Sequence, residues 1–129
     1  MSIRIALRVA VLASWSLASA CSSSPHVPDG QTYAVQIKPF DGDLKAYASQ
    51  STVDVVLQHP GARFASSAPY PDCPALAGLA TYTLKGGDVL LLAFTVRAEG
   101  ATSVAYQRPA RAPADPGLMD AMKREVCRL

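Results

Sequence analysis

The chain has 129 residues, half of them apolar, and carries 12 basic and 10 acidic side chains. An apolar fraction of this size argues against a wholly disordered chain, and the length suits one ordinary domain. Removing Arg4 and Arg8, which lie in a segment that we expect to be cleaved, leaves ten charges of each sign. A neutral domain offers no basic face for phosphate contacts, so we expect no nucleic-acid partner.

The first twenty residues predict an export signal. Arg4 and Arg8 precede a short apolar run over residues 9–18, and small residues close it. A basic start, an apolar middle of about 7–15 residues and small residues at the cut are typical of secretory signals. A transmembrane anchor needs about 20 apolar residues, which is roughly twice this run. We therefore expect residues 1–20 to be a cleaved signal peptide.

The cleavage region resembles that of bacterial lipoproteins, in which Cys21 would become the acylated first residue of the mature chain. Lipoproteins of this kind carry several acyl chains, and two or more chains anchor a protein stably to a membrane. The resemblance implies an outer-membrane lipoprotein facing the periplasm, because Ser22 rather than Asp follows the cysteine. One position departs from the pattern, since Ala18 stands where the family prefers Leu. The run Ala18-Ser19-Ala20 also suits ordinary signal peptidase, so a soluble periplasmic or secreted protein is the alternative.

A polar tether is expected between the signal and the folded part. Residues 21–30 are rich in Ser, Pro and Gly and show no apolar period. Nine extended residues reach at most about 30 Å, so a lipid at Cys21 would hold the domain close to the membrane. We expect a single domain over residues 31–129.

The odd number of cysteines supports the same interpretation. An exported protein normally pairs its cysteines, and this chain has three. If Cys21 carries lipid, Cys73 and Cys127 remain to form a disulfide with each other. Closing this loop of about 55 residues stabilises the fold by about 4 kcal/mol in the chain-entropy model.

The first half of the domain predicts two strands around an ambiguous segment. Residues 31–39 alternate between polar and apolar side chains, which is typical of a half-buried strand. Residues 44–50 suit either a short helix or a loop, and the β-branched residues of 51–58 favour a second strand, which His59-Pro60-Gly61 ends. The larger apolar residues of the first strand share one face: Tyr33, Val35 and Ile37.

The next part predicts a proline-rich loop and a hairpin. Residues 66–74 contain three prolines and indicate a loop, and 76–79 indicate one helical turn. The runs 79–85 and 88–96 flank Gly86-Gly87, a pattern typical of a β-hairpin. Because 88–96 is almost continuously apolar, we expect it to be a central strand covered on both faces.

A strand over 102–107 and a C-terminal helix complete the predicted fold. Asp115 suits the N-cap position of the helix, and Pro116 suits its first turn. Several mostly antiparallel strands with one helix packed on them correspond to the α+β class. Apolar residues recur at every fourth position of the helix and form one stripe: Leu118, Met122 and Val126.

From Pro69 onward the order of features resembles the C-terminal domain of TonB-type energy transducers. The resemblance implies a strand, a turn, a strand, a loop and a helix over about half of the mature chain. It does not extend to the transducer's role, because a transducer has a transmembrane anchor and a long spacer, whereas this chain shows a cleavable signal and a short tether. The matching segments are Ala68-Pro69-Tyr70-Pro71, Phe94-Thr95-Val96 before the turn at Gly100, and Leu118-Met119-Asp120.

No sequence motif indicates catalysis or cofactor binding. The chain contains no G-x-S-x-G elbow, P-loop or dinucleotide fingerprint. His26 and His59 are isolated, so no zinc site is expected, and Asp41-Gly42-Asp43 suits a turn better than a calcium loop. Cys73 beside His59 would make a nucleophile and base, but an oxidising compartment favours the disulfide to Cys127. We expect no catalytic, metal or cofactor site.

The predicted function is a non-enzymatic, lipid-anchored envelope protein whose domain binds another envelope protein through an exposed strand edge. One alternative is a periplasmic inhibitor or immunity-type protein that blocks a toxin or hydrolase, with a proline-rich loop, 66–74 or 108–116, as the plug. Another alternative is a small hydrolase of unrecognised type. It would require a deep pocket ringed by His59, Asp54 and an unpaired Cys73.

Overall fold

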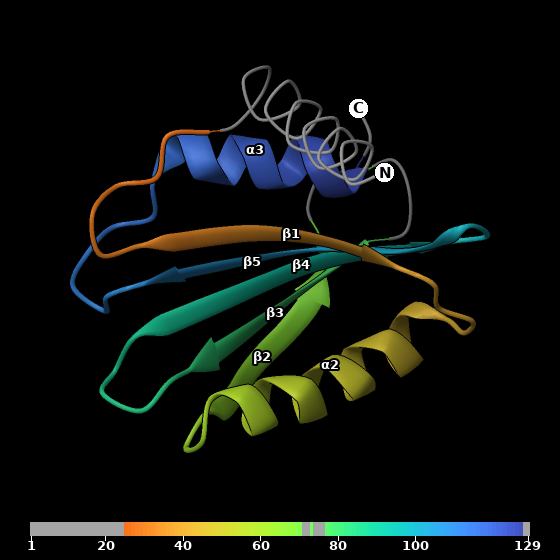
Figure 1. The fold of residues 1–129 in the computed structure, drawn as a ribbon, viewed down its shortest axis with the longest axis horizontal. Helices are drawn as coiled ribbons and strands as arrows, with labels where there is room; N and C mark the ends of the chain where they lie inside the picture. The colour runs from red at the N-terminus through yellow and green to blue at the C-terminus, as the bar shows by residue number, and fades with distance from the viewer. Residues whose placement is uncertain (1–24, 71–72, 74–76, 128–129) are drawn as a thin grey trace, which may run out of the picture.

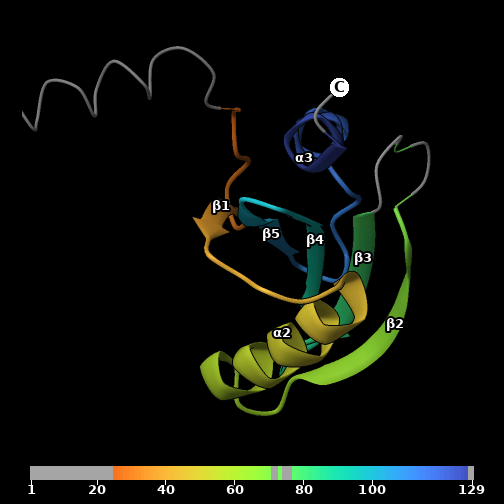
Figure 2. The same cartoon turned by 90° about the vertical axis from the view of Figure 1, so that its right-hand side faces the viewer.

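The computed structural model describes residues 25–70, 73 and 77–127. Over these residues the chain forms a five-stranded antiparallel sheet, with helix α2 (Leu44–Gln58) on one face and helix α3 (Pro116–Cys127) on the other (Figure 1). The strand order across the sheet is β1-β5-β4-β3-β2 (Figure 2), and the predicted α+β class is confirmed. The strands in chain order are β1 (Thr32–Lys38), β2 (Arg63–Pro69), β3 (Ala77–Thr83), β4 (Val89–Arg97) and β5 (Gly100–Arg108).

The centre of the sheet follows the sequence prediction closely. Gly86 and Gly87 have positive φ values of 94° and 97°, which suit glycine, and the Leu84 amide donates to the Asp88 carbonyl across the turn (2.8 Å). This turn joins β3 and β4 as the predicted hairpin. β4 lies in the middle of the sheet, and its residues from position 90 to 95 are all buried. Each face of the sheet therefore carries its own apolar cluster, as expected for a central strand.

The predicted strand over 51–58 is wrong, because these residues form the second half of α2. The preceding segment, which suited either helix or loop, is its first half. The Asp43 carboxylate accepts a hydrogen bond from the Ala46 amide (2.9 Å) and caps a single helix of 15 residues. The β-branched residues Val53 and Val56 lie on its exposed side, so burial of the opposite side outweighs their strand propensity. The buried residues of α2 recur at every fourth position: Tyr47, Ser51 and Val55.

The segment predicted as a loop over 66–74 begins as a strand. β2 takes up its first four residues and pairs with β3 at the edge of the sheet, where proline is tolerated because one side of the strand needs no partner. The helical turn predicted over 76–79 is also wrong, since β3 begins at Ala77. Of the residues in these two segments that belong to neither strand, Tyr70 and Cys73 are described, and 71, 72, 74 and 76 lie outside the described part.

Helix α3 covers one face of the sheet and confirms its prediction. The Asp115 carboxylate accepts a hydrogen bond from the Leu118 amide (3.0 Å), as an N-cap does. The predicted disulfide joins Cys127 at the end of α3 to Cys73, with the two Cα atoms 5.2 Å apart. The buried residues on this face are Tyr70, Ala77, Leu91, Ala93, Val104, Tyr106, Leu118, Met122, Val126 and Cys127.

Helix α2 covers only part of the opposite face. Its main contacts are with β3 and β4. The Thr52 hydroxyl lies 2.8 Å from the Tyr82 hydroxyl and ties the helix to the sheet. Burial raises the pKa of the Tyr82 hydroxyl, and the hydrogen bond with Thr52 acts in the opposite direction. The buried residues on this face are Tyr47, Val55, Ala80, Tyr82, Leu84, Leu90, Leu92, Phe94 and Ala101.

Strand β1 forms one edge of the sheet and is less covered than the sequence predicts. Tyr33, Val35 and Ile37 do share the face on which α3 lies. Because α3 lies over β4 and β5 rather than over β1, Val35 is 42% exposed and Ile37 is 68% exposed. The predicted tether is partly packed as well, since Val27 contacts the cluster on the α3 face.

Candidate binding groove

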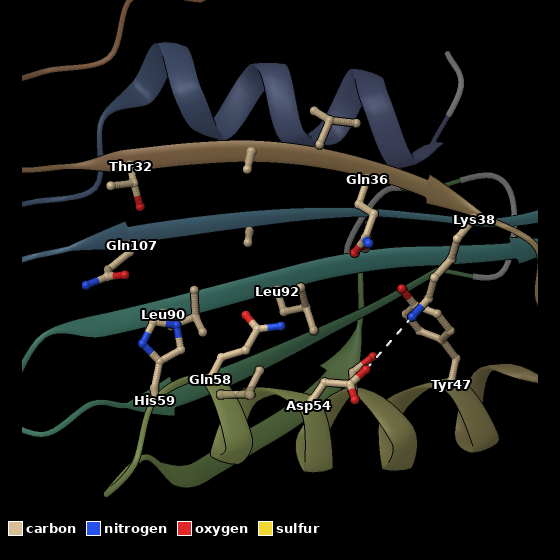
Figure 3. A pocket seen from close by; sticks show the side chains of 16 residues that line it. Thr32, Gln36, Lys38, Tyr47, Asp54, Gln58, His59, Leu90, Leu92 and Gln107 are labelled. Atoms are coloured by element: carbon tan, nitrogen blue, oxygen red, sulfur yellow. Dashed lines mark ion pairs between the residues drawn. The ribbon is translucent and has the colours of Figure 1, made fainter.

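A groove lies on the partly covered face of the sheet, between α2 and β1 (Figure 3). It exists because α2 packs on β3 and β4, whereas the sheet continues through β5 to β1. Its volume is about 620 Å³, within the range of roughly 300–1,000 Å³ that ligand sites usually have. We call this site the α2–β1 groove.

The floor of the α2–β1 groove is made of small and apolar side chains. Leu90 and Leu92 belong to β4, and Ala105 of β5 is paired with Ala34 of β1. Directly paired residues of neighbouring strands point to the same face, so both alanines border the groove. The short side chains of this pair leave open the space that larger residues would fill.

Three glutamine side chains line the groove from three different elements. Gln36 projects from β1 and Gln58 from α2, each toward the space between helix and strand (Figure 3). Gln107 of β5 lies nearer one end and donates a long hydrogen bond to the Asp88 carboxylate (3.4 Å). A primary amide offers donors and an acceptor together, so these side chains match a ligand that also presents both.

Two buried serine hydroxyls belong to the same groove. Ser51 of α2 is 6% exposed and Ser103 of β5 is 4% exposed. A hydroxyl group can both donate and accept a hydrogen bond. Both hydroxyls are therefore able to bond to a molecule that occupies the groove.

Charged groups close one end of the groove. Lys38 Nζ lies 3.9 Å from Asp54 Oδ2 and 5.6 Å from the centre of the Tyr47 ring. Because the two charges offset each other, the groove presents mainly neutral polar groups. The Tyr47 ring is covered by Phe40 and Phe94, at centroid distances of 5.0 and 5.3 Å, and is almost completely buried.

The structure does not bring together the residues that the hydrolase alternative requires. His59 and Asp54 line the α2–β1 groove, whereas Cys73 is bonded to Cys127 on the α3 face of the sheet. A pocket ringed by His59, Asp54 and a free Cys73 is therefore not formed. Asp43, considered as a calcium ligand, caps α2 instead.

Three further expectations from the sequence concern metal binding, membrane spans and the lipid-attachment residue. Over the described part of the chain, no three His, Cys, Asp or Glu side chains are grouped so that they could hold a metal ion. In the same residues, no helix has both the length and the apolar character needed to cross a bilayer. Cys21, the predicted lipid-attachment residue, lies outside the described residues.

The two proline-rich segments considered as an inhibitory plug differ in structure. The first four residues of 66–74 belong to β2 and are not a loop. The segment 108–116 runs from the last residue of β5 to the first residue of α3. The loop between them is held against the domain, because the Asp115 amide donates to the Tyr106 hydroxyl (2.9 Å) and Arg108 donates to the Ala112 carbonyl (3.3 Å).

The groove has no single signature in the amino-acid sequence that would mark it in advance. Its polar residues come from β1, α2 and β5, which are far apart in the chain, and half of α2 was predicted to be a strand. The second face of β1 carried a partial signal from which the groove could have been predicted. That face carries small or polar side chains, Thr32, Ala34, Gln36 and Lys38, and all four line the groove.

The chain matches no protein-family model, no curated protein and no solved structure. The resemblances to lipoprotein signals and to TonB-type domains therefore stay predictions.

Proposed function

We propose that this protein is a lipid-anchored envelope protein that binds another envelope protein, and that the α2–β1 groove holds an extended segment of that partner. The observation that carries the proposal is the groove itself. It offers about 620 Å³ of space, neutral hydrogen-bonding side chains on its walls and a floor of leucine and alanine. Its role in this proposal is binding, with no reaction assigned to it.

An extended polypeptide suits the chemistry of the groove. Each peptide unit presents one N–H donor and one carbonyl acceptor. Gln36 and Gln58 supply both kinds of group from opposite walls. The hydroxyls of Ser51 and Ser103 add two more bonding groups, and the leucines of β4 provide apolar surface for alternate side chains of the bound segment.

Other ligand classes suit the groove less well. Sugar rings usually stack on an open aromatic face, and the aromatic side chain that lines this groove, Tyr47, is packed between Phe40 and Phe94. A strongly charged ligand would find no net opposite charge where Lys38 and Asp54 offset each other.

The lipid anchor is proposed from the sequence pattern around Cys21. The face of the sheet along which the chain enters the domain is compatible with it. The segment before β1 runs along the α3 face (Figure 2), where Val27 contacts the apolar cluster. The groove lies on the opposite face of the sheet. A domain tethered through residues 21–30 would thus present the groove on the side away from its anchor.

Site-specific photo-crosslinking in intact envelopes tests the binding role. A photoreactive side chain at Gln58 borders the groove, whereas at Leu57, one residue away on α2, it lies outside the residues that line the groove. We expect a discrete adduct from position 58, with peptides of one exported protein in it, and none from position 57. Equal adducts from both positions, or none from 58, would contradict the proposal.

A variant that fills the groove provides a second readout. Ala105→Leu adds three carbon atoms to the floor, and we expect it to abolish the adduct formed from position 58. Ala98→Leu, at an exposed position after β4, is the matched control and should leave the adduct unchanged. Thermal unfolding of both variants separates loss of binding from loss of fold.

Intact-mass analysis of protein extracted from membranes tests the anchor. We expect a chain that begins at Cys21 and carries the mass of several acyl chains. Cys21→Ala should release the domain into the soluble fraction. A mature chain with an unmodified first residue would overturn the lipid anchor and leave the groove proposal in place.

A further inference from the structure

We infer that two copies of this protein pair through their β1 edges, so that one continuous antiparallel sheet forms and two α2–β1 grooves join. The inference rests on the proposed function, because the groove that the second copy completes is the one proposed to hold the partner segment. Among the described residues, β1 pairs on one side only, with β5, over seven consecutive positions without a bulge. Such an edge is a ready template for another strand.

The opposite edge of the sheet is protected in the ways that edge strands usually are. β2 begins with the charged Arg63, ends with Pro69 and has a bulge between Phe64 and Ser66. β1 contains no proline, and its one charged residue, at its last position, interacts with Asp54. The contrast between the edges points to β1 as the side that associates.

The apolar residues on the α3 side of β1 are placed symmetrically about Val35. Antiparallel pairing of two copies centred there places Val35 opposite its own equivalent, and Tyr33 opposite Ile37 of the second copy. These apolar pairs lie on the α3 side, where Val35 and Ile37 are otherwise exposed. The pairs on the groove side are small or polar and bring no like charges together: Ala34 with Gln36, and Thr32 with Lys38.

The symmetry of this arrangement completes the groove. Two antiparallel strands centred on one residue are related by a twofold axis perpendicular to the sheet, so both α2 helices lie on the same face. The groove of one copy lies between its α2 and the β1 edge (Figure 3). Beyond that edge would stand the groove of the second copy. The two merge into one wider groove with an α2 helix as each wall.

The proposed membrane anchor is compatible with this twofold symmetry, and it would also raise the local concentration of the protein. Val27 packs on the α3 face, so the tethers of both copies would leave on one side of the joined sheet and reach one membrane. A pair of seven-residue strands buries less than the roughly 1,200–2,000 Å² of a standard interface, so we expect weak pairing in solution. Confinement to a surface raises the effective concentration and favours the pair.

Disulfide trapping in native membranes tests the pairing with the full chain. Val35→Cys would place two thiols opposite each other at the twofold axis, whereas Ser67→Cys, exposed on β2, is the matched control at the other edge. We expect about tenfold more disulfide-linked dimer from the first variant, because the paired thiols sit at millimolar effective concentration. The unsubstituted protein gives the background.

The register is tested with two differently tagged copies in one cell. Ala34→Cys in one copy and Gln36→Cys in the other should form the mixed dimer in preference to either homodimer, because these positions face each other. Val35→Lys places like charges at the axis and should abolish co-purification of the two tags, whereas Ser67→Lys should not.

The outcomes separate this inference from the proposed function. Equal trapping at positions 35 and 67, or co-purification that survives Val35→Lys, overturns the pairing through β1. If the groove position 58 still captures a partner in that case, the binding role stands without the dimer. If position 35 is trapped but position 58 captures nothing, the dimer stands and the proposed function fails.

Discussion

The two faces of the sheet carry helices of similar length, of 12 and 15 residues, yet they are covered very differently. α3 lies over β4 and β5 with its apolar stripe fully buried, and a disulfide fixes its end to Cys73. α2 lies over β3 and β4 and leaves β1 and β5 bordering a groove. Placing a helix off-centre on one face leaves space for a ligand, while the helix on the other face is packed along its whole apolar stripe.

This difference follows from the residues that each helix turns toward the sheet. α3 buries Leu118, Met122 and Val126, which bring large apolar surfaces into contact with the strands. α2 buries Tyr47 and Val55 but also a serine, and three of its large apolar residues are exposed: Val53, Val56 and Leu57. We therefore expect substitutions on the α3 face to change the free energy of unfolding more than those on the α2 face.

The largest expected effect comes from the disulfide on the α3 face. Replacing both Cys73 and Cys127 with Ser should lower the free energy of unfolding by about 4 kcal/mol, because the unfolded chain is no longer constrained over a 54-residue separation. Urea denaturation of the mature protein measures the change. Reduced wild-type protein is the control and should unfold at the same urea concentration as the variant. A loss below about 1 kcal/mol would show that the bridge contributes little.

A core substitution on α3 should come next. Met122 is fully buried, and Met122→Ala should cost about 2–5 kcal/mol through lost packing and the cavity left behind. Leu57→Ala removes an exposed apolar residue from α2 and should change stability by less than about 0.5 kcal/mol. Comparable losses from the two variants in thermal unfolding would contradict the proposed difference between the faces.

A smaller effect is expected where β5 begins, next to the end of β1. Gly100 has a φ of +139°, and a Cβ there would lie 2.7 Å from the Lys38 carbonyl oxygen. Gly100→Ala should therefore cost about 1–3 kcal/mol and displace the end of β1. Gly86→Ala is the control, because its φ of +94° is also unfavourable for alanine but nothing lies within 4 Å. Hydrogen exchange in β1 should accelerate only in the first variant.

The smallest expected effect concerns Tyr82 on the α2 face. Tyr82→Phe removes the hydrogen bond to Thr52 and should cost about 1 kcal/mol at neutral pH. Burial raises the pKa of Tyr82 above 10.0, so the unfolded chain loses this proton first as the pH rises. The contribution of protonated Tyr82 to the free energy of unfolding is fully present below pH 10. It declines as the pH rises toward the pKa of Tyr82 in the folded protein.

The control for this prediction is Thr52→Val, which removes the same hydrogen bond and keeps the tyrosine hydroxyl. Unfolding measured between neutral pH and about pH 11 should show a weaker alkaline decline for Tyr82→Phe than for Thr52→Val. Identical alkaline declines would show that the ionisation of Tyr82 is not coupled to folding.

The elements predicted correctly are those whose signals are local. The hairpin at Gly86-Gly87 follows from two glycines between apolar runs, and α3 follows from Asp115, Pro116 and a stripe at every fourth residue. The half of the chain before these elements was predicted less well. β2 contains Ser, Ala and Pro rather than typical strand residues, and it is a strand because β3 offers a free edge beside it.

Helix α2 shows why the groove was missed. Val53 and Val56 suggested a strand, and only the packing of Tyr47 and Val55 on β3 and β4 shows which side of the segment is buried. Only the packing of α2 on the sheet brings Gln58 and Ser51 into the same groove as Gln36. The polar residues of the groove therefore gave no pattern that the sequence alone would reveal.

By itself the sequence determined the α+β class, the central hairpin, the C-terminal helix and the pairing of Cys73 with Cys127, since each depends on neighbouring residues or on the parity of the cysteines. The tertiary structure alone decided that α2 is one helix, that it lies off-centre, and that β1 pairs on one side only within the described part of the chain. These features depend on contacts between residues distant in the chain, and the groove exists only where those contacts leave space.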